Sequence, residues 1–459
     1  MGENTNKKAL QEIRKKIYTM ILPITIASVL EMATGLVSMA MIGRIGSNSS
    51  IAVDAIGISS RITQIVWALF KGITTGTAVF VAQAYGANNH RKLKQVIKQT
   101  IISSIFLVII LQLIIYFNAN LLLGIFNPGE NLMQNAVLYL KTISFGLPFL
   151  TIMLAVAASL QGMGNAKTPM IIGFIVNIIN IILSYLLIFG HLGIPALGLK
   201  GAAIATVCAQ ICGALLGLYV LLGKNGVLNS EINKNIFMVD IKQVIEIYKV
   251  GIPASMESIF WQIAAIILTK AILTFGETTF AAHQFGLQAE SISYLPAAGF
   301  GVAATTLIGQ ALGAKNKEQG KSYFKETLKG AVLITCFCSA ILVFFPKVLM
   351  SMLTPNEEII NLGAKYLFIM GLVQLPQNIS GVINGALRGS GYTRIPMYIA
   401  AVGLWGIRVP FTLAFTYIFH LSIIVIWIVM GIDLIFRFLL SLILYRKKDI
   451  YNRELVFKE

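Results

Sequence analysis

Apolar runs of roughly 20 residues recur along the whole chain of 459 residues, and each can cross a hydrocarbon core of about 30 Å as an α-helix. Hydrophobic residues make up 56% of the chain and charged residues only 12%, a balance that no soluble domain of this size carries. We therefore expect an all-α polytopic membrane protein. Turn signals divide the apolar runs into twelve predicted spans, near residues 17–42, 54–82, 97–117, 134–160, 169–190, 199–222, 245–274, 281–311, 328–345, 358–387, 396–418 and 421–444.

Basic residues are concentrated in alternate connections between these spans. Arg14, Lys15 and Lys16 precede the first span, and Arg446 and Lys447 follow the last. The intervening connections of the opposite set hold few basic residues, namely Arg44, Lys200 and Lys347. The positive-inside rule predicts that both termini are cytoplasmic and that the chain is a multi-pass protein of the plasma membrane. The net charge of +17 is thus a topology signal and does not indicate a nucleic-acid partner.

The sequence repeats itself at an offset of 227 residues. Residues 82–87 (AQAYGA) match residues 309–314 (GQALGA), and residues 160–170 (LQGMGNAKTPM) match residues 387–397 (LRGSGYTRIPM). The offset spans six helices, an even number, so the halves are parallel repeats, an arrangement typical of transporters that move two bundles around a central cavity. Near the starts of the halves the offset is 230, and it pairs Pro23 with Pro253 and Gly46 with Gly276.

The repeat divides the chain into two predicted lobes of six helices each. The predicted parts are a basic N-terminus at 1–16, an N-lobe at 17–222, a linker at 223–242, a C-lobe at 243–445 and a basic tail at 446–459.

These motifs together resemble the MATE (multidrug and toxic compound extrusion) family over essentially the whole chain. The resemblance rests on Pro23 with IGRIG at 42–46, on QAYGA and QALGA, on QGMGNAKTPM with GLKGAAIAT at 198–206, and on RGSGYTRIPM with LWGIRVP at 404–410. It implies alternating access between two six-helix lobes, with H⁺ or Na⁺ entry driving export of drugs, toxins or metabolites. It implies neither an enzyme nor a cofactor or metal site, and we expect a monomer in the lipid bilayer.

Ionisable residues inside a span are costly, and they are candidates for function by default. Glu31 and Glu257 each follow, within two helical turns, the proline that opens their lobe, and a carboxylate among apolar neighbours can take up and release a proton. Glu290 lies on a predicted polar stripe with Gln284 and Gln288. Several other ionisable residues have structural explanations: Asp433 and Arg437 as an i, i+4 pair, Arg408 within a family-like motif, and Arg388 and Arg394 as cytoplasmic anchors.

The sequence departs from the family at the usual coupling positions. The resemblance implies an aspartate where this chain has Ser38 and, in some relatives, another at Ser184; sodium-coupled relatives carry carboxylates where this chain has Gln377 and Trp261. Our hypothesis is that Glu31 and, separately, Glu257 have taken over coupling. The predicted ion-coupling residues are Glu31, Ser38, Asn177, Asn180, Ser184 and Glu257. The predicted substrate-cavity residues are Trp261, Gln284, Gln288, Glu290 and Gln377.

The substrate class is less constrained. The resemblance implies amphipathic cations, whereas Lys71 and Lys141 within the spans leave open a neutral, zwitterionic or anionic substrate. An alternative of the same superfamily is a flippase or exporter of a lipid-linked or anionic substrate. The sequence has no GxxxxGK[ST] for ATP binding and no HExxH zinc-protease motif, and the repeat with buried carboxylates favours a transporter over a channel.

Overall fold

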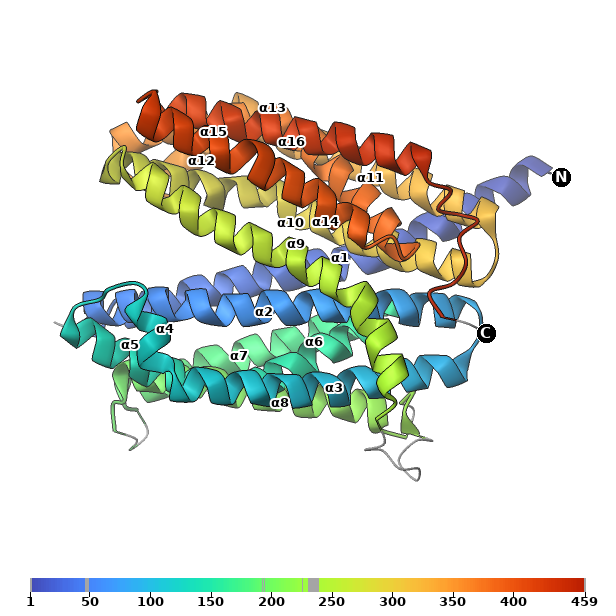
Figure 1. Ribbon diagram of the computed structural model, residues 1–459, viewed down its shortest axis with the longest axis horizontal. Coiled ribbons are helices and arrows are strands. Elements are labelled where there is room, and N and C mark those ends of the chain that lie inside the picture. Colours follow the sequence, from blue (N-terminus) through green and yellow to red (C-terminus); the bar gives the residue numbers. More distant parts are fainter. Residues whose placement is uncertain are drawn as a thin grey trace. The chain divides into compact units, whose positions relative to one another are not determined.

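The computed structural model describes residues 2–45, 49–191, 193, 195–224, 226–229 and 239–457 (Figure 1). Eleven helices in this part of the chain are long and apolar enough to cross a membrane, and a bent pair makes a twelfth span. This confirms the predicted all-α fold and its spans. Gly46 and much of the predicted linker lie outside the described residues.

The spans follow one another along the chain. They are α1 (Gly2–Ile42), α2 (Ser49–Gly86), α3 (His90–Phe117), the pair α5 (Glu130–Ser144) and α6 (Leu147–Gly162), α7 (Lys167–Phe189), α8 (Gly198–Leu222), α9 (Ile241–Leu273), α10 (Glu277–Gly313), α11 (Lys317–Phe344), α13 (Glu357–Gly389), the run of α14 (Arg394–Ala401), η2 (Val402–Arg408), α15 (Val409–Leu413) and η3 (Ala414–Ile418), and α16 (Ile423–Lys447). Two short helices, α4 (Ala119–Gly124) and α12 (Pro346–Ser351), precede α5 and α13.

The fourth predicted span, 134–160, is broken. Helices α5 and α6 meet at an angle of 48°. Gly146 is the N-cap of α6 and Pro148 lies in its first turn, where its missing N–H has no helical partner to lose. The glycine and proline therefore end one helix and start the next within a single apolar run.

Contacts group the described chain into two units. One holds residues up to 25, residues 82–88 and the chain from 250 onward, and the other holds residues 26–81 and 89–249. Helices α1, α2 and α9 each contribute to both units. The lobe boundaries inferred from the repeat remain a prediction.

Each unit contains helices that approach closely at glycines. In the unit that holds the chain from 250 onward, a Cβ on Gly385 would overlap the carbonyl oxygen of Gly301, and Thr305 Oγ1 donates a hydrogen bond of 3.0 Å to Gly385 O. These contacts hold α10 against α13. In the other unit, a Cβ on Gly201 would lie 2.5 Å from Leu187 O, which explains why the GLKGAA motif has a glycine where α8 turns back along α7.

The duplicated AQAYGA and GQALGA motifs contact each other within one unit. A Cβ on Gly86 would overlap Gln310 O, and a Cβ on Gly313 would overlap Gln83 O. The same motif thus provides both sides of a close crossing between the ends of α2 and α10. The second pair of repeated motifs forms turns, in which Gly164 and its repeat partner Gly391 have φ values of 88° and 84° that favour glycine.

The C-terminal tail packs on the same unit. The backbone N–H of Val456 donates to Gln83 Oε1 at 2.8 Å, and Gln83 Nε2 donates to Gly389 O at 3.0 Å. The Arg453 guanidinium lies 3.7 Å above the centre of the Tyr392 ring. A glutamine of the repeated motif therefore joins the tail to the end of α13.

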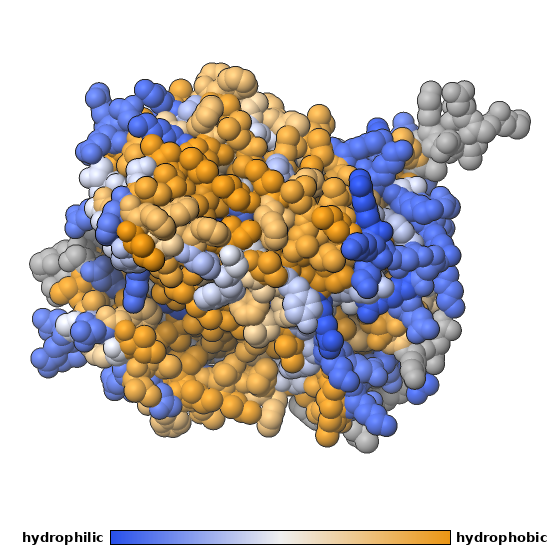
Figure 2. Space-filling model, turned by 45° about the horizontal axis from the view of Figure 1, so that its top comes forward, coloured by the Kyte–Doolittle hydropathy of each residue, from blue (hydrophilic) through white to orange (hydrophobic). Residues whose placement is uncertain are grey.

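Large apolar side chains are exposed along the outer faces of the helices, as expected for contact with lipid. Figure 2 shows apolar side chains over much of the face in view, with hydrophilic side chains gathered toward the left and right ends of the molecule. The most exposed apolar side chains include Phe106, Phe117, Tyr219, Leu333, Phe337 and Phe344.

Candidate functional site

A cavity of about 550 Å³ lies within the unit formed by residues 26–81 and 89–249. Its wall comes from α1, α2, α5, α6, α7 and α8. Apolar and aromatic side chains such as Trp67 and Tyr139 form much of it. Its polar lining consists of Glu31, Thr34, Ser38, Ser60, Lys71, Asn177, Asn180, Ser184, Thr206 and Gln210.

The structure thus brings together the five N-lobe residues that the sequence singled out. Asn177, Asn180 and Ser184 reach the cavity from one face of α7, while Glu31 and Ser38 reach it from α1. The sequence indicated this through their spacing, which is three and four residues on α7 and seven residues on α1. Their role in ion coupling stays a prediction.

A chain of hydrogen bonds links three helices across this wall. Ser38 Oγ donates to Asn180 Oδ1 at 3.3 Å, and Asn180 Nδ2 donates to Thr206 Oγ1 at 3.1 Å. Thr206 Oγ1 in turn donates to Ala202 O at 3.0 Å, one turn earlier on α8. The Asn180 amide and the Thr206 hydroxyl each donate and accept, so a buried amide is satisfied while it still faces the cavity.

The cavity holds one acidic and one basic side chain. Glu31 from α1 and Lys71 from α2 both line it and interact electrostatically. Lys71 Nζ also lies 5.9 Å from the centre of the Trp67 ring, within the range of a cation–π contact. Lys141, the other lysine that the sequence raised, does not line this cavity and lies over Tyr116 instead, at 5.2 Å.

Four polar residues of this wall were not predicted, namely Thr34, Ser60, Thr206 and Gln210. Thr206 is the last residue of GLKGAAIAT, and its spacing on α8 from Gln210 places both on one helix face. Gln210 Oε1 is buried without a hydrogen-bond partner in the structure, and it packs against Gly146 at the break between α5 and α6. The four-residue spacing of Thr206 and Gln210 within an alanine-rich helix could have indicated their shared face in the sequence.

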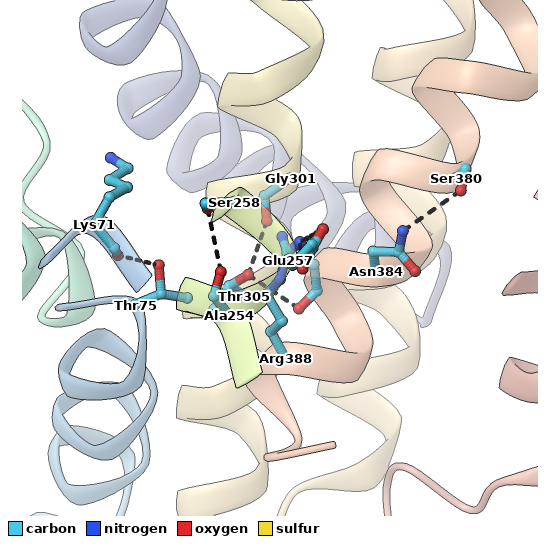
Figure 3. A network of polar contacts seen from close by, with 11 residues as sticks. Lys71, Thr75, Ala254, Glu257, Ser258, Gly301, Thr305, Ser380, Asn384 and Arg388 are labelled. Carbon is cyan, nitrogen blue, oxygen red and sulfur yellow. Dashed lines mark hydrogen bonds and ion pairs between the residues drawn. The ribbon is translucent and has the colours of Figure 1, made fainter. Parts of the chain in front are cut away.

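A second cavity, of about 180 Å³, lies in the unit that contains the chain from 250 onward. Glu257 and Trp261 of α9 and Gln377 of α13 line it, so a predicted ion-coupling residue lies beside two predicted substrate-cavity residues. The Glu257 carboxylate receives Arg388 Nη2 at 2.6 and 2.7 Å, and Figure 3 shows Arg388 pointing from α13 toward Glu257. Arg388, which was expected to be a cytoplasmic anchor, lies in the last turn of α13 and forms an ion pair with Glu257.

Trp261 lies against a buried charge cluster. The guanidinium groups of Arg408 and Arg437 are 5.1 and 4.8 Å from the centre of its ring. Both arginines also donate to Asp433 Oδ2, each at 2.7 Å. The predicted i, i+4 pair of Asp433 and Arg437 is confirmed, and Arg408 joins it from η2.

Glu290 is separate from the Glu257 cavity. Its buried carboxylate accepts hydrogen bonds from Tyr366 Oη at 2.6 Å and Gln374 Nε2 at 2.8 Å. Gln284 is exposed and Gln288 half-buried, and the lining of the Glu257 cavity includes none of these three α10 residues. Of the predicted substrate-cavity residues, Trp261 and Gln377 therefore line this cavity, and the three residues of α10 do not. Tyr366 and Gln374 were missed because their α13 positions are distant in sequence, although Tyr366 matches Tyr139 in the repeat.

Comparison with known proteins gives consistent matches over the whole chain. The MatE family model matches residues 23–186 and 253–414. The probable multidrug resistance protein NorM of Thermotoga maritima is 30% identical over 456 residues, which cover 98% of this chain and 97% of that protein. The probable multidrug resistance protein YoeA of Bacillus subtilis is 24% identical over 92% of this chain and 91% of its own length.

Solved structures also match the fold. A crystal structure of MATE in the straight conformation aligns with a TM-score of 0.86 at 20% identity, covering 95% of this chain and 96% of that one. A MOP superfamily transporter from Pyrococcus furiosus, described as having a binding pocket of reverse polarity, aligns with a TM-score of 0.83 at 20% identity over 95% of both chains.

Proposed function

Since this chain belongs to the MATE family of membrane transporters, we propose that it exports amphipathic organic compounds by H⁺- or Na⁺-coupled antiport with alternating access. The names of its relatives as multidrug resistance proteins support drugs and toxins among the substrates. The proposal includes a monomer in the plasma membrane with both termini in the cytoplasm, and it requires no catalytic residue and no cofactor other than the coupling ion.

The observation that carries this proposal is the cavity around Glu31. At about 550 Å³ it is within the range of pockets that hold drug-sized ligands. Its apolar and aromatic wall suits an amphipathic body, and its carboxylate and amides supply polar contacts. Substrate and coupling ion can therefore compete for the same few groups, which is what antiport requires.

The two candidate carboxylates differ in their partners. Glu31 shares its cavity with Lys71 and with the network of Ser38 and Asn180, whereas Glu257 is bound directly by Arg388. An ion that binds at Glu257 must first displace a charge-assisted hydrogen-bonded pair. We therefore assign the main coupling role to Glu31, with Asn177, Asn180 and Ser184 as its polar surroundings, and a secondary role to Glu257.

Purified protein in liposomes tests this assignment. With an imposed proton gradient and, separately, a sodium gradient, uptake of a cationic dye is expected to fall about tenfold or more in Glu31→Gln, because loss of a positioned proton-transfer group has effects of that size or larger. A smaller loss is expected in Glu257→Gln.

Glu277→Gln is the matched control for this assay, because Glu277 is an exposed carboxylate in the first turn of α10. It should keep full uptake. The assignment is wrong if Glu31→Gln and Glu257→Gln both keep full ion-driven uptake. Absence of transport by the unaltered protein under every gradient would count against the exporter itself.

A second candidate function is export of an anionic or lipid-linked substrate, and Lys71 is the observation that favours it. Its ammonium group lines the same cavity as Glu31, beside the Trp67 ring. Removing it in Lys71→Gln should then weaken uptake of an anionic dye at least about tenfold, because the loss of one ion pair in a cavity shielded from water lowers the affinity for the anion by about that factor. Uptake of the cationic dye should be unchanged or increased.

A further inference from the structure

A groove separates α1 from α11 at the level where the predicted spans of both helices begin. Arg14, Ile17 and Tyr18 line it from α1, and Glu326, Lys329 and Leu333 line it from α11, around a cavity of about 280 Å³. All of these residues belong to one unit, and none of them belongs to the two cavities described above.

A single buried carboxylate holds two cations at the mouth of this groove. Glu326, whose side chain is 4% exposed, accepts from Arg14 Nε at 2.7 Å and from Lys329 Nζ at 2.8 Å. The two basic side chains are themselves 52% and 56% exposed. One negative charge offsets only one of the two positive charges, so the groove keeps a net positive charge. Lys16, which donates to Tyr323 Oη at 3.4 Å, adds another cation beside it.

The groove continues into an apolar surface. Leu333 lines it and is 69% exposed, and Phe337, one turn further along α11, is 68% exposed. On the α1 side, Tyr18 is exposed at the mouth and Leu22, one turn on, is exposed as well. Exposed leucine and phenylalanine on a membrane span face acyl chains, and an exposed tyrosine at the start of a span is typical of the headgroup level. Along the groove, positive charge at the mouth is thus followed by apolar surface, which is the order of the anionic headgroup and the acyl chain in a phospholipid.

We propose that this groove is a binding site for an anionic phospholipid. The headgroup phosphate lies between Arg14 and Lys329, and an acyl chain follows Leu333 and Phe337. Arg14 uses Nε for Glu326, and its guanidinium carries two further nitrogens with the geometry that suits phosphate oxygens. Basic pockets between spans bind anionic headgroups on this physical basis. A zwitterionic choline headgroup brings its own cation into a groove that is already positive, so anionic lipid is preferred.

Native mass spectrometry of the detergent-purified protein, incubated with phosphatidylglycerol or phosphatidylcholine, counts the lipids that remain bound. Phosphatidylglycerol should be retained in preference to phosphatidylcholine. Its affinity should fall about 25-fold in the double variant Arg14→Gln/Lys329→Gln, since each basic residue at an anionic membrane surface contributes about fivefold.

The matched control is Lys200→Gln/Lys347→Gln, which also removes two positive charges, from exposed positions on α8 and α12. This control should retain the lipid fully. Arg14→Lys, which keeps the charge, should also retain it. Millimolar inorganic phosphate should not displace the lipid. Melting in the same detergent checks folding; if the double variant does not fold, Arg14→Gln alone, with an expected loss of about fivefold, carries the test.

Three results overturn the proposal. The first is equal retention of phosphatidylglycerol by the double variant and by its control. The second is equal affinity for phosphatidylcholine. The third is displacement of the lipid by inorganic phosphate, which would assign the groove to a free anion. None of these results bears on transport, so the site and the exporter function are tested independently.

Discussion

Replacing Asp433 by asparagine should destabilise this protein by about 3–5 kcal/mol, the usual cost of leaving a buried charge without its partner. Asp433 is completely buried, and its Oδ2 atom receives both Arg408 and Arg437. Without that carboxylate, two guanidinium groups face each other within a membrane bundle, with the Trp261 ring as their shared neighbour. The measurement is the midpoint of thermal unfolding in detergent, followed by transport of the fraction that remains folded.

Arg437→Gln is the informative comparison for this change. It removes one of two cations and leaves the pair of Arg408 and Asp433, so the cluster becomes neutral and the loss of stability should be much smaller than in Asp433→Asn. Glu277→Gln, at an exposed position, should leave the unfolding midpoint unchanged. Equal midpoints for Asp433→Asn and Glu277→Gln would show that the cluster contributes nothing to stability.

A methyl group added at Gly385 should destabilise the protein, which is the second large effect, and one added a single turn earlier at Gly381 should stabilise it slightly. The Cβ of alanine at 385 overlaps the carbonyl oxygen of Gly301 on α10, so α10 and α13 must move apart and the Thr305 bond to Gly385 O must lengthen. Overpacking of this kind costs about 1–3 kcal/mol, and more when backbone has to move.

A Cβ on Gly381 would meet no neighbouring atom within 4 Å, and alanine there gains up to about 1 kcal/mol of helix propensity. The two alanine variants therefore differ in the sign of their effect although they lie on one helix. Thermal unfolding in detergent measures both. An unfolding midpoint for Gly385→Ala at or above that of Gly381→Ala would contradict the close approach of α10 and α13.

Local patterns in the sequence predicted those features that depend on one helix at a time. Apolar run length predicts the spans, and the i, i+4 rule predicts the pair of Asp433 and Arg437. The shared face of Asn177, Asn180 and Ser184 follows from helical spacing in the same way. In each of these side-chain groups the residues that matter lie within two turns of one another.

Features that join distant helices were not predictable in this way. Arg408 lies 25 residues from Asp433, and Tyr366 and Gln374 lie 76 and 84 residues from Glu290, so no local period connects them. The pairing of Arg388, the first residue of RGSG, with Glu257 was also not predicted, because the two residues lie 131 positions apart. The bend at Gly146 was not predicted either, although Gly146 and Pro148 together are a signal for a helix break.

The crossing of α2 and α10 has the form of an isologous contact, in which the same patch of two identical chains meets itself. Gly86 lies on Gln310 and Gly313 lies on Gln83, and each residue is related to its counterpart by the offset of 227. In a homodimer every substitution in such a patch changes both sides of the contact at once, because both subunits have the same sequence. A fused duplicate is free of that constraint, and here it is Gln83 that binds Val456 of the C-terminal tail. The close backbone contacts at Gly86 and Gly313 are thus symmetric, as in a homodimer, whereas the hydrogen bond between Gln83 and Val456 is formed by one of the two repeats.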